Sequence, residues 1–141
     1  GAEVYATTSR NEDMLRKLGV DRVLNYQDED VARTLYRSVD VLIDTVGHGD
    51  EVLDAVKDGG RAATPAAAFN EDVAGTRDIQ TAHIIHRVDK GQLTEILRLV
   101  ADGKIKVVID EIFPFTAEGA ADAFERVGSG HAAGKLLIKV I

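Results

Sequence analysis

The fold is decided by residues 39–46, which read Val39-Asp40-Val41-Leu42-Ile43-Asp44-Thr45-Val46. The centre of this stretch is a continuous apolar run, which is typical of a parallel β-strand covered on both faces. Gly47-His48-Gly49 follows at once and predicts that the strand ends there. We therefore expect a parallel sheet with helices packed against it.

Strand and helix patterns alternate on either side of this stretch. Apolar spacing predicts further strands at residues 3–8, 22–26, 61–64 and 79–86. Helices are predicted between them, at residues 12–18, 31–36 and 52–60, and an alanine-rich loop runs from Pro65 to about Asp78. Ser9 or Asn11 is expected to cap the first helix, and Gly19 to end it. The alternation indicates βαβ units and hence an α/β fold with a doubly wound parallel sheet.

The last third of the chain has a different pattern. Leu93, Ile96, Leu97, Val100 and Ala101 form a helical apolar stripe that ends at Gly103. A strand is predicted at residues 107–113 and another at residues 135–140. Between these strands Thr116 is expected to cap a helix that turns four residues inward, namely Ala120, Ala123, Phe124 and Val127.

Composition excludes several classes of function. The 141 residues carry a formal net charge of −7 and no basic stripe, which argues against nucleic acid as a partner. No apolar run approaches the roughly 20 residues that cross a bilayer, so no membrane partner is expected. Cysteine is absent, which excludes disulfides and thiolate metal sites and is compatible with a cytoplasmic location.

A glycine-rich turn follows the central strand, but it is a poor phosphate loop. The segment Gly47-His48-Gly49-Asp50-Glu51-Val52 resembles the pattern G-x-G-x-x-G. Two carboxylates would stand where a phosphate needs free N–H groups and positive potential. Val52 also replaces the small residue that close packing of helix on strand requires. We interpret the segment as an ordinary turn at a strand end.

The carboxyl ends of the predicted strands are candidate ligand-binding positions. A doubly wound sheet binds its ligand outside these ends. Thr45, Val46 and Gly47 stand at one such end and residues 64–66 at another, either as part of a ligand edge or as plain strand exits. The first strand ends in Thr7-Thr8-Ser9-Arg10, without the acidic residue that favours NAD. An Arg beside a hydroxyl suits the 2′-phosphate of NADP, so NADP(H) is preferred over NAD(H), unless Arg10 is simply a solvated side chain.

The sequence offers no metal site and names no catalytic residue. His83 and His86 would point to opposite faces of a strand, and His48 and His131 lie in separate glycine turns. The G-x-S-x-G pattern of a serine hydrolase is missing. The catalytic residues therefore stay unknown.

Taken together, several segments resemble the medium-chain dehydrogenase/reductase superfamily, in its zinc-free quinone oxidoreductase and enoyl reductase branch. The resemblance covers nearly the whole chain in unbroken order. The matching segments are residues 1–8, 18–26, 39–47, 59–61, 103–105, 110–115, 118–125 and 134–138. The resemblance implies an NADPH-dependent enzyme that transfers hydride to a quinone or an activated alkene.

The same resemblance implies a domain organisation. Residues 1–87 would be a partial Rossmann-like dinucleotide-binding domain whose first strand and glycine loop are missing. Residues 88–141 would be a C-terminal segment that packs with the GroES-like catalytic domain. The strand at residues 79–86 would be the edge through which two subunits form a homodimer. The alternative is a stand-alone, non-catalytic fragment or a dimerising nucleotide-binding module.

The resemblance also assigns roles in cofactor binding. Ser9 and Arg10 would lie near the 2′-phosphate, and Tyr26 would lie beside the adenosine. Thr45, Val46 and Gly47 would line the ribose side. The remaining candidates are Ile84, Ile85 and His86 near the nicotinamide, and Lys135 at a phosphate.

Overall fold

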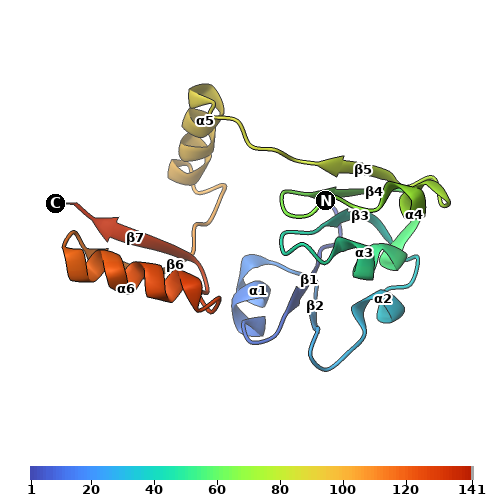
Figure 1. The fold of residues 1–141 in the computed structure, drawn as a ribbon, viewed down its shortest axis with the longest axis horizontal. Coiled ribbons are helices and arrows are strands. Elements are labelled where there is room, and N and C mark those ends of the chain that lie inside the picture. Colours follow the sequence, from blue (N-terminus) through green and yellow to red (C-terminus); the bar gives the residue numbers. More distant parts are fainter. Residues whose placement is uncertain (141) are drawn as a thin grey trace. The chain divides into compact units, whose positions relative to one another are not determined.

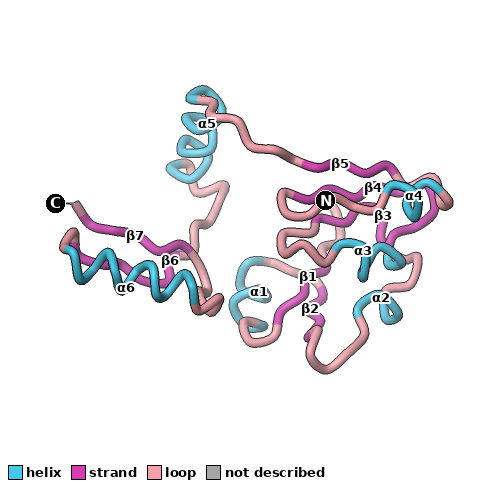
Figure 2. The backbone as a smooth tube through the Cα atoms, viewed as in Figure 1, coloured by secondary structure: helices cyan, strands magenta, loops and turns pink. Residues whose placement is uncertain are grey.

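The computed structural model describes residues 1–140, which form two compact units (Figure 1). The first unit runs from Gly1 to Val88, and the second begins at Asp89. Each unit has its own parallel strands with helices, as Figure 2 shows, so the predicted α/β class is confirmed.

The first unit alternates strands and short helices. Its strands are β1 (Tyr5–Thr8), β2 (Arg22–Asn25), β3 (Val39–Ile43), β4 (Val56–Thr64) and β5 (Gln80–His83). Its helices are α1 (Glu12–Leu18), α2 (Val31–Thr34), α3 (Gly49–Val52), the 3-10 helix η1 (Leu53–Ala55) and α4 (Glu71–Gly75). Gly19 ends α1 in the left-handed conformation with φ +96°, as predicted. Asn11 occupies the other end of α1, but its side chain makes no capping hydrogen bond.

The strands of the first unit form two parallel sheets. One sheet contains β1 and β2, and the other has the order β3-β4-β5. Within the described residues no backbone ladder joins β1 to β3. A side-chain cluster connects the two sheets instead: buried Leu24, Leu35 and Ala55 pack with the half-buried Tyr5 and Val39.

The central strand differs from its prediction. It ends at Ile43, and it is not covered on both faces, because Val41 and Ile43 are 56% and 61% exposed. Side chains alternate between the two faces of a strand, and Leu42, on the face opposite Val41 and Ile43, packs against a core cluster. In addition, β3 has a ladder partner on one side only within the described part of the chain, namely β4. Its apolar run therefore lies at an open edge.

The predicted helix at residues 52–60 is wrong beyond Ala55. Val56 is fully buried and begins β4 by pairing with Val39, whereas Val41 pairs with Arg61. Residues 57–60 therefore bulge out of the ladder, and Gly59 adopts φ +73° to allow it. A Cβ atom at Gly60 would lie 2.6 Å from Val56 Cγ1. Long-range pairing, and not local helix propensity, decides this segment.

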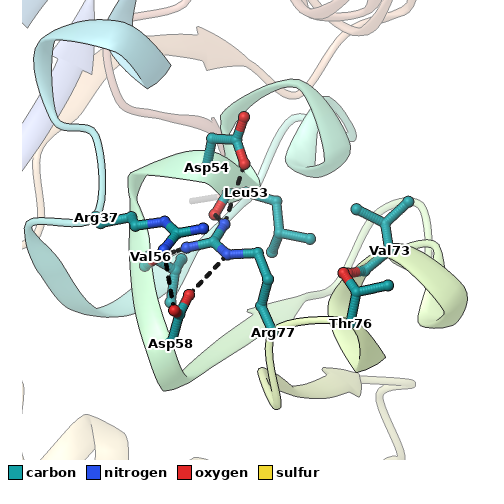
Figure 3. Close-up of polar contacts among 8 residues, drawn as sticks. All are labelled: Arg37, Leu53, Asp54, Val56, Asp58, Val73, Thr76 and Arg77. Atoms are coloured by element: carbon teal, nitrogen blue, oxygen red, sulfur yellow. Dashed lines mark hydrogen bonds and ion pairs between the residues drawn. The ribbon is translucent and has the colours of Figure 1, made fainter.

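A buried arginine holds the bulge in place (Figure 3). The Arg77 side chain is 10% exposed and donates to the Asp54 carboxylate at 3.0 Å and to the Asp58 carboxylate at 2.9 Å. It also donates to the backbone carbonyl oxygens of Leu53 and Val56. These bonds fasten the connection between α4 and β5 to the start of β4. We call this group the Arg77 clamp.

Two more segments near the end of the first unit differ from expectation. The alanine-rich loop contains the helix α4, whose N-cap Asn70 accepts hydrogen bonds from the N–H groups of Asp72 and Val73. The strand predicted at residues 79–86 ends at His83. His86 therefore lies beyond the strand, and the prediction that His83 and His86 point to opposite faces of one strand is wrong.

The second unit contains two helices and two strands. These are α5 (Lys90–Ala101), β6 (Ile109–Pro114), α6 (Ala117–Gly128) and β7 (Lys135–Lys139), and β6 pairs with β7 in parallel. Thr116 caps α6 as predicted, with its hydroxyl accepting from the N–H of Gly119 at 3.0 Å. Phe124 and Val127 are wrong as inward residues, because they are 78% and 61% exposed. Ala123 is buried as predicted, and the helix packs on the strands through Ala123 and through Gly119, which was not predicted to face inward.

Candidate functional site

The carboxyl ends of β1 and β2 meet at one edge of the first sheet. The two strands pair residue by residue up to Thr8 and Asn25. The N–H of Tyr26 then donates to the Thr8 carbonyl at 3.3 Å, which keeps the two exits together. The next residues of both strands, Ser9 and Tyr26, are thereby brought to the same place.

Three predicted residues share this edge. The Tyr26 hydroxyl donates to Ser9 Oγ at 3.0 Å, and Arg10 follows Ser9 directly. A shallow hollow of about 420 Å³ begins here and continues along α1; its lining includes Ser9, Arg10, Asn11, Glu12 and Arg16. Within residues 1–140 the Arg10 guanidinium has no hydrogen-bond or ion-pair partner, whereas Arg16 pairs with Glu12 at 3.0 Å. Arg10 is thus the cation of this hollow that is free to bind an anion.

A second edge is formed by the turn after β3, which contains Thr45, Val46 and Gly47. Asp44 precedes the turn and is 7% exposed. Its carboxylate accepts hydrogen bonds from the N–H groups of Val46 at 2.9 Å and Gly47 at 3.1 Å. Gly47 has φ +98°, a conformation that favours glycine. The turn is fixed, yet Thr45 and Val46 stay exposed to a ligand.

The loop after β4 packs against this turn. A Cβ atom on Gly47 would lie 3.6 Å from Ala66 Cβ, and the Phe69 ring fills the space over Gly49. The N–H of Asn70 donates to the Asp50 carboxylate at 2.8 Å. A hollow of about 200 Å³ lies between the two segments, lined by residues 47–51 and 67–68.

The remaining predicted residues are not gathered into one constellation. Ile84, Ile85 and His86 follow β5 and are exposed, and the N–H of Ile84 donates to the Thr64 carbonyl at 2.8 Å. Lys135 begins β7 in the second unit. The cofactor contacts predicted for these four residues stay predictions.

Asp44 is the site residue that sequence reasoning missed. A carboxylate directly after an apolar strand and three residues before a glycine is typical of a turn in which the side chain binds the following N–H groups. That signal was present in the residues Asp44 to Gly47. The burial that makes the carboxylate a fixed part of the turn depends on the fold.

Electrostatic and metal-binding features elsewhere are modest. The Tyr5 hydroxyl donates to the Glu3 carboxylate at 2.9 Å, and this hydrogen bond raises the pKa of Tyr5. Among residues 1–140 no group of three or more His, Cys, Asp or Glu side chains is placed to hold a metal ion. No helix in this range combines the length and apolar character needed to cross a membrane.

Comparison with known proteins gives consistent matches along the chain. A family model described as zinc-binding dehydrogenase matches residues 18–138. A 2-methylene-furan-3-one reductase from Solanum lycopersicum is 31% identical over 99% of this chain and 34% of its own length. An NADPH-dependent alkenal/one oxidoreductase of Arabidopsis thaliana, described as chloroplastic, is 29% identical over 98% of this chain and 34% of its own length.

Solved structures of the same kind are also similar. The quinone oxidoreductase from Coxiella burnetii has a TM-score of 0.81 and 26% identity, covering 98% of this chain and 45% of its own. A structure described as an NAD-dependent alcohol dehydrogenase has a TM-score of 0.82 and 27% identity, covering 100% of this chain and 45% of its own. The chain thus spans about a third to a half of the length of the proteins that it matches.

Proposed function

The chain belongs to the zinc-binding dehydrogenase family, and on that premise we propose that it is part of an NADPH-dependent oxidoreductase that transfers hydride to a quinone or an activated alkene. The resemblance to the medium-chain dehydrogenase/reductase superfamily is confirmed. Relatives named as alkenal/one, furanone and quinone reductases support this class of acceptor. Because the chain spans less than half of these relatives, the activity is proposed for a longer protein.

The observation that carries the proposal is the cluster at the ends of β1 and β2. Arg10 is exposed and unpaired within the described residues. It follows Ser9 in sequence and lines the same hollow, and Ser9 Oγ lies 3.0 Å from the Tyr26 hydroxyl. A guanidinium beside two hydroxyls provides charge-assisted hydrogen bonds for the 2′-phosphate that distinguishes NADPH from NADH. These residues fit the cofactor at its adenosine end.

The order of the strands supports a missing central element. In a doubly wound sheet of this class the first strand lies in the middle, between the second and the fourth. Within the described residues β1 pairs only with β2, and β3 pairs only with β4, so each has one open ladder edge. We propose that a strand with its phosphate-binding glycine loop, upstream of Gly1 in the longer protein, fills this position.

The cofactor brings the redox chemistry, and the chain's residues bind and orient it. When bound, the nicotinamide supplies the hydride. In this proposal Arg10 and Ser9 hold the 2′-phosphate, and the turn at Thr45 to Gly47 lines the ribose. Residues 84–86 approach the nicotinamide, and Lys135 contacts a phosphate.

Metal chemistry is not assigned to this chain. We propose that the protein belongs to the zinc-free branch, and this proposal rests on the sequence resemblance alone. Residues 89–140 are proposed to pack with the catalytic domain, because their exposed apolar side chains, such as Phe124 at 78%, need a covering surface.

A homodimer is proposed through the outer edge of β5. This strand ends the order β3-β4-β5 and has no partner on its far side within the described residues. Ile85 and Val88 beyond it are 77% and 101% exposed. An apolar edge of this kind invites pairing with a second copy. A cytoplasmic location is proposed as well, although one relative is described as chloroplastic and another as mitochondrial.

The decisive experiment compares NADPH and NADH binding to the wild-type protein and to Arg10→Ala by fluorescence titration. We expect tighter binding of NADPH, and a loss of about tenfold in NADPH affinity for the variant, since a charge-assisted hydrogen bond contributes roughly 1.5–3 kcal/mol. NADH affinity should change little. Arg16→Ala is the matched control, because Arg16 lines the same hollow but is already paired with Glu12.

The outcomes separate the competing assignments. Equal dissociation constants for the two cofactors in the wild-type protein would contradict the preference for NADPH. An equal loss in Arg16→Ala would show that the effect is general electrostatics. Binding of neither cofactor would favour the non-catalytic module.

A further inference from the structure

Four strands of the first unit end in the same way. At each carboxyl end a side-chain oxygen accepts the backbone N–H of the residue two positions later. The four residues that supply these oxygens are Thr8, Asn25, Asp44 and Thr64, with N···O distances of 3.3, 3.1, 2.9 and 3.0 Å. Thr8 and Asp44 also accept from the N–H three positions later. The N–H groups that these four side chains bind are therefore used inside the protein.

Asp44 is the strongest of the four. It is 7% exposed, and its two oxygens both lie 3.1 Å from the N–H nitrogen of Gly47, while Oδ1 also accepts from Val46. An ionised carboxylate accepts such bonds more strongly than a neutral hydroxyl or amide. Gly47 at φ +98° completes a turn whose conformation is set by this one side chain.

This arrangement determines what the turn is able to recognise. A phosphate at a strand end is normally held by free N–H groups and positive potential. Here the N–H groups of Val46 and Gly47 point to Asp44, and the carboxylates of Asp50 and Glu51 follow in α3. The turn thus offers a ligand no free N–H group at Val46 or Gly47. Carboxylates stand beside it, with Glu51 Oε1 3.2 Å from His48 Nδ1, and they disfavour an anion.

We infer that Asp44 is the positioning residue of the cofactor edge, and that it makes the turn at residues 45–47 a receptor for hydroxyl or amide donors and not for phosphate. The inference rests on the proposed function for the identity of the ligand. Asp44 acts by fixing the turn, and the ligand contacts Thr45 to Gly47. The anionic part of the ligand is then bound elsewhere.

The first test needs no nicotinamide cofactor. Amide exchange and ¹H–¹⁵N spectra are recorded for the wild-type protein, Asp44→Ala and Asp44→Asn, with inorganic pyrophosphate as the anionic probe. We expect exchange at Val46 and Gly47 to accelerate roughly tenfold or more in Asp44→Ala, with partial recovery in Asp44→Asn, which keeps one acceptor oxygen. Pyrophosphate should leave both amide signals of the wild-type protein unshifted. Shifted signals there, or unchanged exchange in Asp44→Ala, would overturn the inference.

The second test measures NADPH binding by the same variants. Asp44→Ala should bind roughly tenfold more weakly, and Asp44→Asn should recover most of the affinity. Glu71→Gln is the matched control, since it removes a carboxylate charge from an exposed residue that lines neither hollow and leaves both N–H bonds in place, and it should stay within about twofold of the wild-type value. Thermal unfolding checks that each variant is folded. If Asp44→Ala does not fold, the NADPH affinity of Asp44→Asn alone tests the positioning role of Asp44.

The two tests distinguish a failure of the inference about Asp44 from a failure of the proposed function. Unchanged NADPH affinity in a variant with faster exchange at Val46 and Gly47 would refute the positioning role. A wild-type protein that binds neither NADPH nor NADH would remove the proposed function, while the exchange and pyrophosphate measurements would still confirm or refute the role of Asp44 in the turn.

Discussion

Replacing Arg77 with Met tests how the bulge in β4 is held. The two ion pairs of Arg77 contribute little, roughly 0–1 kcal/mol each, because the Asp54 and Asp58 side chains are 66% and 55% exposed. The carbonyl of Leu53 keeps a second donor, the N–H of Val56. The carbonyl of Val56 belongs to a fully buried residue, and losing its charged donor costs about 1.5–3 kcal/mol. The sum predicts a loss of about 1.5–5 kcal/mol in the free energy of unfolding.

Urea unfolding followed by circular dichroism measures this loss as a shift of the midpoint at constant m-value. Arg37→Met is the matched control, because Arg37 pairs with the same Asp58 at 3.0 Å but is 44% exposed. Its cost should stay below about 1 kcal/mol. A loss below about 0.5 kcal/mol for Arg77→Met, or an equal loss for both variants, would refute the reasoning.

Three further predictions concern other parts of the chain. Thr116→Ala should lower the free energy of unfolding by about 1 kcal/mol in urea titrations, with Thr116→Ser close to wild type, because the hydroxyl caps α6. The hydrogen bond from Arg98 lowers the pKa of Glu95, so this pair stabilises the fold above the ordinary pKa of a glutamate, and the stabilisation is lost as pH falls through the lowered pKa. An NMR titration should show a higher pKa for Glu95 in Arg98→Gln than in the wild-type protein. Equal Glu95 pKa values in the two proteins would contradict this prediction. Ile85→Asp should shift sedimentation toward the monomer, whereas a wild-type monomer would remove the proposed dimer.

Local signals predicted the local parts of this fold. Gly19 and Thr116 end and begin their helices as expected, because capping depends on a few neighbouring residues. The bulge at residues 57–60 was missed because it depends on the pairing of Val56 with Val39, seventeen positions earlier in sequence. The outward direction of Phe124 was missed because the apolar spacing of α6 does not decide which side of the helix faces the strands. The helix packs through Gly119 and Ala123, and this leaves Phe124 exposed.

The position of the candidate site could be predicted from the sequence, but the hydrogen bonds that determine which groups are free to bind a ligand could not. The resemblance assigned Ser9 and Tyr26 to the same end of the cofactor, and the Tyr26 hydroxyl lies 3.0 Å from Ser9 Oγ because parallel strands bring their carboxyl ends to one edge. Which N–H groups a ligand finds free at that edge depends on side-chain contacts such as those of Asp44. Such contacts follow from burial, which composition and spacing alone do not provide.

The two ends of β4 take part in different interactions, one in fold stability and the other in the proposed ligand site, which matters for engineering. Its first residue, Val56, belongs to the Arg77 clamp, and its last, Thr64, belongs to the ligand edge. The regular part of the strand from Arg61 to Thr64 alone spans roughly 10 Å at about 3.3 Å per residue, a separation at which mutational effects add independently. A designer can therefore raise thermal tolerance by optimising the clamp without the usual trade-off against binding.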